Sequence, residues 1–232
     1  MLSEVPFFIS GAYILLTLMF LYFFWRMLHK DLGNKIANRT IIALLAWSTL
    51  VCVLAANGVY EDFQAKPPRF VFVVLPILGA IIYILFKYTK VVKQLDILRL
   101  TYLHMIRVPV EIFIFIWFTY GIVPQEMTFE GRNFDILSGL TAPIVAYFIA
   151  KHGVKKHVKM AYAWNILALL LVLNIVVTAV LSLPSNFQVF GLEQPNIAVI
   201  NAPFVLLPAV IVPIVIFCQI VSMIKLREMR DY

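Results

Sequence analysis

The sequence predicts an all-α integral membrane protein, a seven-transmembrane-helix bundle with its N-terminus outside and its C-terminus in the cytoplasm. The first observation is composition, because 62% of the 232 residues are hydrophobic and only 13% are charged, outside the usual range for soluble globular domains. The second is the recurrence of apolar runs long enough to cross a bilayer. The third is the one-sided placement of basic residues. We therefore expect residues 1–232 to form a single polytopic membrane domain.

Apolar runs bounded by charge, proline or asparagine can each cross about 30 Å of hydrocarbon as a helix. They fall at residues 7–28, 40–60, 69–89, 100–123, 136–152, 160–183 and 203–225. The fifth run is the shortest and contains Pro143, and its loss would invert every later helix. In the seventh run, Pro208 and Pro213 each remove a backbone donor and predict a bend.

The basic residues indicate the orientation of these helices. Most of the 19 Lys and Arg residues lie in the connections after the first, third and fifth runs or after the seventh. The opposite side holds only Lys66, Arg69 and Arg132. Because basic residues accumulate on the cytoplasmic side, this alternation places the N-terminus outside. We expect the protein in a cell membrane, namely the cytoplasmic (inner) membrane of a bacterium.

Charge and cysteine content argue against several other classes of protein. The net charge of +7 comes from residues that flank the membrane and form no continuous patch, so no nucleic-acid partner is expected. Cys52 and Cys218 both lie in apolar runs, which indicates neither a disulfide framework nor a cysteine zinc site. The four histidines show no compelling metal-ligand spacing, and we expect no metal and no cofactor. The expected partners are membrane lipids and an unidentified small solute or lipid.

Three polar residues of the fourth run are the main clue to function. His104, Arg107 and Glu111 share one face of a helix in an otherwise apolar segment. A charge in hydrocarbon is costly, so it normally faces a partner, a cavity or a transport pathway. Arg107 and Glu111, four residues apart, can partly neutralise one another. They form either a structural salt bridge or a working site, in which Glu111 exchanges protons and Arg107 binds an anionic group.

Other polar residues lie in the sixth and seventh runs. Asn165, Asn174, Gln219 and Ser222 are each surrounded by apolar neighbours in the sequence. If they face inward, they complete an intramembrane polar site with the residues of the fourth run. The alternative is that they form ordinary hydrogen bonds between helices.

The external connections 124–135 and 184–202 are rich in polar and turn-forming residues. The candidates for binding at an outer mouth are Glu130, Arg132, Asn133 and Asp135 in the first connection and Gln194 and Asn196 in the second. They could bind a polar head group or solute, or they could be ordinary solvated loop residues. Asp135 is equally well placed to cap the fifth helix.

These observations predict a polytopic membrane protein with a polar intramembrane cavity that binds and translocates a small solute, with proton coupling as one option. The second hypothesis is a membrane-embedded enzyme that acts on a lipid or isoprenoid, with Glu111 or His104 as acid or base. The third is a seven-helix sensor or assembly protein. No nucleophile elbow or carboxylate-rich metal motif occurs in the sequence, which leaves open whether the protein is an enzyme.

Overall fold

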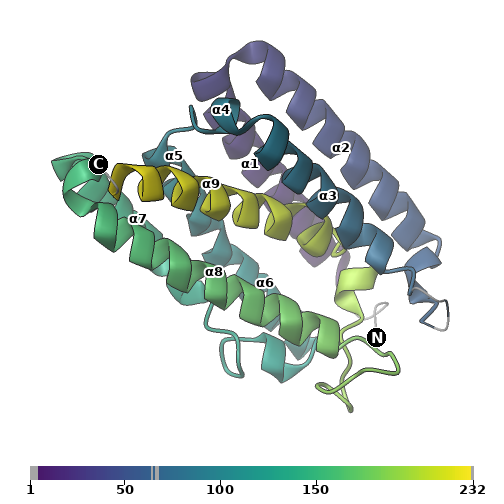
Figure 1. The fold of residues 1–232 in the computed structure, drawn as a ribbon. Helices are drawn as coiled ribbons and strands as arrows, with labels where there is room; N and C mark the ends of the chain where they lie inside the picture. Colours follow the sequence, from purple (N-terminus) through teal and green to yellow (C-terminus); the bar gives the residue numbers. More distant parts are fainter. Residues whose placement is uncertain (1–4, 64, 66–67, 231–232) are drawn as a thin grey trace.

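The computed structural model describes residues 5–63, 65 and 68–230, and all the regular structure in these residues is helical (Figure 1). Lys66, expected on the outer side of the membrane, lies outside the described residues. Five helical segments are long and apolar enough to cross a membrane. The chain is therefore an all-α protein with the features of a membrane protein, as its composition predicts.

The five long segments account for most of the chain. They are α1 (Phe7–Leu32), α2 (Asn34–Ala56), α5 (Ile97–Leu103) continued by η3 (His104–Ile106) and α6 (Arg107–Thr119), η5 (Val154–His157) continued by α8 (Val158–Leu181), and η7 (Leu207–Ile211) continued by α9 (Val212–Arg230). Two shorter apolar helices, α3 (Val71–Lys87) and α7 (Ile136–His152), occupy the other two predicted ranges. Single turns occur in the connections: η2 (Val59–Glu61), α4 (Thr89–Val92), η4 (Gln125–Met127) and η6 (Ala198–Ile200).

Helix α9 lies inside the bundle. It packs along α8 and also contacts α5 and α3, while α1 and α2 form a helical hairpin beside them (Figure 1). In the η7–α9 segment 67% of an apolar 18-residue stretch is buried, compared with 17% in α2. The exposed side chains are themselves often large and apolar, among them Phe8, Leu15, Phe86 and Leu170. Such an exterior is expected where lipid surrounds the helices.

Two irregular turns interrupt the long segments. The fourth predicted run is two α-helices joined by the 3₁₀ turn η3, and Pro109 in α6 lacks the N–H that would bond to the Met105 carbonyl. The seventh run begins with the π-helical turn η7, which contains Pro208. Such turns often mark functional positions in helices. Pro208 thus lies at a change of helix type, from the π-helical turn to the α-helix α9.

The indole of Trp47 links α2 to the start of α9. Its Nε1 atom donates a hydrogen bond of 3.1 Å to the carbonyl of Ala209. Because Pro213 has no N–H, this carbonyl lacks its normal helical donor. Trp47 therefore donates to a backbone carbonyl to which Pro213 cannot donate.

The connection 184–202 folds back onto the bundle. The backbone N–H groups of Ile197 and Ala198 both donate to the carbonyl of Ile122, at 3.0 and 3.1 Å. The N–H of Asn196 donates to the carbonyl of Ser182 at 2.8 Å. These bonds close this end of the helices with ordered backbone.

Candidate functional site

Arg107, the first residue of α6, forms an ion pair inside the bundle. Its Nη1 atom donates to Asp135 Oδ1 at 2.6 Å and to the backbone carbonyl of Ala168 on α8 at 2.9 Å. Arg107 is only 3% exposed and Asp135 only 4%. Asp135 stands at the N-cap position of α7, but its side chain accepts bonds from Arg107 and Ser138 and caps no backbone N–H. The ion-pair partner of Arg107 is therefore Asp135, and not Glu111 as the i,i+4 spacing suggested.

Glu111 lies one turn further along α6 and is also buried. Its Oε2 atom accepts a hydrogen bond of 2.5 Å from Asn133 Nδ2. The same amide donates to the carbonyl of Met127 at 2.9 Å, which fixes its position in the 124–135 connection. Among the described residues, no ion pair reaches Glu111. Glu111, the second carboxyl group of this site, is thus held by the side-chain amide of Asn133.

Two glycines have no room for a side chain, Gly139 where α7 meets α6 and Gly131 inside the 124–135 connection. A Cβ atom added at Gly139 would lie 2.8 Å from both the backbone nitrogen and Cγ2 of Val108. At Gly131 it would lie 2.2 Å from the carbonyl oxygen of Gln125. Neither space admits a side chain without movement of the backbone. Glycine at these positions therefore lets α7 lie against α6 and the connection turn back on itself.

Several buried polar atoms around Arg107 have no hydrogen-bond partner in the described part of the chain. They belong to five side chains, each 3% exposed or less: both ring nitrogens of His104, Nε and Nη2 of Arg107, Oδ1 of Asn165, both amide atoms of Gln219, and Oγ of Ser222. We call these five side chains the unpaired polar cluster. A buried polar group without a partner costs about 1–3 kcal/mol, and native structures contain few of them.

Contacts with α8 bring the first members of this cluster together. The bond from Arg107 to the Ala168 carbonyl lies one helical turn from Asn165. The ring of His104 packs edge-on against the indole of Trp164, with centroids 5.5 Å apart, and Trp164 immediately precedes Asn165. His104, Arg107 and Asn165 therefore lie at the same level of the bundle.

Contacts with α9 bring the remaining members to this level. Arg107 lies near Cys218, the residue before Gln219, and Ser222 follows one turn later. Helix α9 also packs against both α5 and α8. Three helical segments that are distant in sequence thus contribute to one polar region.

Three other predicted site residues bond to the backbone of the connections and helix ends. Asn174 Nδ2 donates to the carbonyl of Arg132 at 2.8 Å. Gln194 Nε2 donates to two backbone carbonyls at and beyond the end of α6, at 2.9 and 2.5 Å. Asn196 Nδ2 donates to a carbonyl of α8 at 3.1 Å. These side chains hold the connections in place, and Asn174 lies apart from the unpaired polar cluster.

The residues expected at an outer mouth separate into two groups. Glu130 and Arg132 are exposed at the surface, whereas Asn133 and Asp135 turn inward and bond to α6.

Sequence reasoning missed the role of the Ala168 carbonyl as an acceptor for Arg107, since a backbone acceptor gives no side-chain signal.

The unpaired polar cluster offers both donors and acceptors. The unpartnered Nε and Nη2 atoms of Arg107 can bind a carboxylate or phosphate oxygen, and His104, Gln219 and Ser222 can each donate and accept. In the described residues, no group of three or more His, Cys, Asp or Glu side chains could hold a metal ion. The arrangement suits a small polar molecule with an anionic group.

Comparison with known proteins gives one match. Residues 68–227 match a protein family described as "Domain of unknown function (DUF8737)". No curated protein and no solved structure matches the chain. The matched range contains the whole unpaired polar cluster and its partners in the 124–135 connection, whereas α1 and α2 precede it.

Proposed function

The chain belongs to the DUF8737 family, whose function is unknown, and we propose that it binds a small polar solute at the unpaired polar cluster and carries it across a membrane. The observation that carries this proposal is the set of buried polar atoms without partners on α5–η3–α6, α8 and α9. Buried polar atoms normally have a hydrogen-bond partner. A solute that supplies the missing hydrogen bonds offsets the cost of burying them.

The proposal includes seven membrane spans, with the N-terminus outside and the C-terminus in the cytoplasm of a bacterium. Helices α3 and α7 have 17 residues each, which corresponds to about 26 Å at 1.5 Å per residue. This length lies at the lower end of the range for membrane-spanning helices. The basic connections after α1, between α3 and α5, and after α7 support the orientation.

Substitution of Gln219 distinguishes solute binding by the unpaired polar cluster from a purely structural role of the cluster. Both of its amide atoms lack partners in the structure. If the cluster only fills space, Gln219→Met replaces the unsatisfied amide with an apolar side chain of similar size. The substitution then raises the melting temperature of the protein. If the cluster binds a solute, the same substitution removes two of the groups that hold it.

The test is native mass spectrometry of the protein extracted in mild detergent, with the mass compared with the 26.5 kDa chain. We expect wild-type protein to retain a bound species that is lighter than a phospholipid, and folded Gln219→Met protein to lose it. Ser48→Ala is the control, because Ser48 bonds within its own helix, to the Leu44 carbonyl at 2.7 Å. A bare chain in all three proteins, with Gln219→Met the most heat-resistant, would contradict the proposal.

Glu111 is the candidate for proton coupling. Its carboxyl is buried and accepts a bond from Asn133, and a glutamine at this position keeps an acceptor for that amide. We therefore expect Glu111→Gln protein to fold. Once the bound species is identified, its uptake by proteoliposomes should depend on external pH for the wild type and lose that dependence in the variant. Failure of Glu111→Gln protein to accumulate in the membrane would instead favour a structural role.

A further inference from the structure

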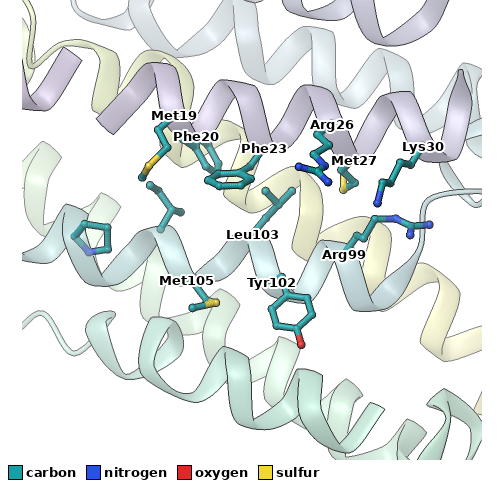
Figure 2. Close-up of a pocket in the computed structure, with 12 residues that line it drawn as sticks. Met19, Phe20, Phe23, Arg26, Met27, Lys30, Arg99, Tyr102, Leu103 and Met105 are labelled. Atoms are coloured by element: carbon teal, nitrogen blue, oxygen red, sulfur yellow. The ribbon is translucent and has the colours of Figure 1, made fainter. Parts of the chain in front are cut away.

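A groove of about 420 Å³ runs between α1 and the α5–η3–α6 segment, on the side of that segment away from the unpaired polar cluster. Figure 2 shows Met19, Phe20 and Phe23 on α1 above Leu103 on the facing segment. Its walls are apolar over most of their length, and they include Met19, Phe20, Phe23, Leu103, Ile106 and Pro109. Three of its lining side chains, Met19, Phe23 and Met105, are exposed on the outside of the bundle, where lipid would lie.

One end of this groove is positively charged. Arg26 and Lys30 extend from α1 toward Arg99 on α5 (Figure 2). In the described part of the chain, no ion pair involves Arg26 or Lys30. Arg99 pairs with Asp31, and that carboxylate also accepts the backbone N–H of Asp96 at 2.9 Å. The nearby carboxylates, Asp31 and Asp96, both pair with Arg99, and Arg26 and Lys30 remain uncompensated.

The length of the groove matches one leaflet of a bilayer. Met19 and Lys30 mark its two ends on α1, and eleven residues of helix extend about 16 Å. Half of the hydrocarbon core of a bilayer is about 15 Å thick. An acyl chain along the apolar walls would therefore place its head group at the charged end.

We propose that this groove binds one anionic phospholipid, with an acyl chain between α1 and the α5–η3–α6 segment and its phosphate beside Arg26, Lys30 and Arg99. The inference rests on the proposed orientation, which places the charged end in the cytoplasmic leaflet, where anionic lipids attract basic clusters between helices. Charge and shape both favour this occupant, because the groove combines uncompensated cations at one end with apolar walls along the remainder.

The experiment titrates the purified protein in detergent with phosphatidylglycerol or phosphatidylcholine and counts bound lipid by native mass spectrometry. We expect wild-type protein to prefer phosphatidylglycerol. Arg26→Gln/Lys30→Gln should weaken this binding about 30-fold, since each basic residue contributes roughly a factor of five. Both side chains are exposed and free of ion pairs, so the variant should fold. Arg99 is left intact because it holds Asp31.

Lys35→Gln/Arg39→Gln is the matched control. It removes two exposed charges at the same end of the hairpin, on α2 and outside the groove, and should change phosphatidylglycerol binding less than about threefold. Met19→Trp tests the apolar half, because the larger side chain fills the groove and should release the lipid with all charges present. Met19 is 45% exposed, so the core is not disturbed.

Three outcomes would overturn the inference. Equal losses in the two double variants would show general attraction to charge, and unchanged binding by Met19→Trp would show a head-group contact without the groove. Full competition by glycerol 3-phosphate would indicate a soluble phosphate ligand. Because lipid is counted directly, the result is independent of whether the unpaired polar cluster carries a solute.

Discussion

Arg107 is a buried charge whose partner lies 28 residues away in the sequence. The ion pair with Asp135 joins the start of α6 to the start of α7. Both groups are nearly inaccessible to solvent, so neither can be hydrated if its partner is lost. Removal of one member therefore leaves an uncompensated charge inside the bundle.

Asp135→Asn is expected to destabilise the protein by about 3–5 kcal/mol, because Arg107 keeps its charge and loses its counter-ion. The double variant Arg107→Gln/Asp135→Asn should recover part of this loss, since neither buried charge remains. Thermal unfolding in a single detergent measures all three proteins. The control is Glu130→Gln, an exposed carboxylate of the same connection, which should change stability by less than about 0.5 kcal/mol. A double variant no more stable than Asp135→Asn protein would contradict this account.

Sequence reasoning finds the polar residues within the apolar runs more readily than their partners in the connections. His104, Arg107 and Glu111 are conspicuous because their neighbours are apolar. Asn133 and Asp135 occur in a polar connection, where such residues are common and give no sign that they turn inward. Their inward direction depends on the path of the backbone, which the linear spacing does not reveal.

At the scale of helices, the packing of α7 on α6 depends on Gly139. An added Cβ would meet the backbone of Val108, so Gly139→Ala must push the two helices apart and strain the bond between Arg107 and Asp135. We expect a loss of about 1–3 kcal/mol in thermal stability. Gly11→Ala is the control, since a Cβ there meets nothing within 4 Å and alanine favours the helix by up to about 1 kcal/mol. Equal effects of the two substitutions would contradict this account.

The link between α2 and α9 gives a second prediction. Trp47→Phe should cost about 1–3 kcal/mol, because the Ala209 carbonyl loses its donor inside the bundle. In a Pro213→Ala background the same substitution should cost less, since residue 213 then supplies an N–H. Stability in detergent, compared across the four proteins of this cycle, measures the difference. An equal loss of stability from Trp47→Phe in the wild-type and Pro213→Ala backgrounds would contradict this role of the Trp47 hydrogen bond.

The helical ranges follow from apolar runs, whereas the kinds of helix within them do not. Residues 136–152 were predicted with the bounds that α7 has in the structure. The turn at His104–Ile106 was not predicted, because the same polar and apolar spacing fits a continuous α-helix. Pro109, which frees a carbonyl in the turn before it, was the available signal.

At the scale of the whole molecule, the proposed orientation predicts which residues face each side of the membrane. In a cysteine-free background, Glu130→Cys should react with a membrane-impermeant maleimide added to intact cells. Lys35→Cys and Lys156→Cys, at exposed positions on the predicted cytoplasmic side, should react only after the cells are opened. The reverse pattern would invert the orientation, and labelling of both sides from outside would contradict the predicted number of spans.

The 124–135 connection and the buried charges cannot change independently. If this connection moved away from the bundle, Arg107 would lose Asp135 and Glu111 would lose Asn133 in the same step. Arg107 and Glu111 would then remain four residues apart on α6, the spacing at which opposite charges pair. The helix thus carries a substitute counter-ion for its own arginine. Outward movement of the connection would exchange one ion pair for another, and Arg107 would keep a counter-ion inside the bundle.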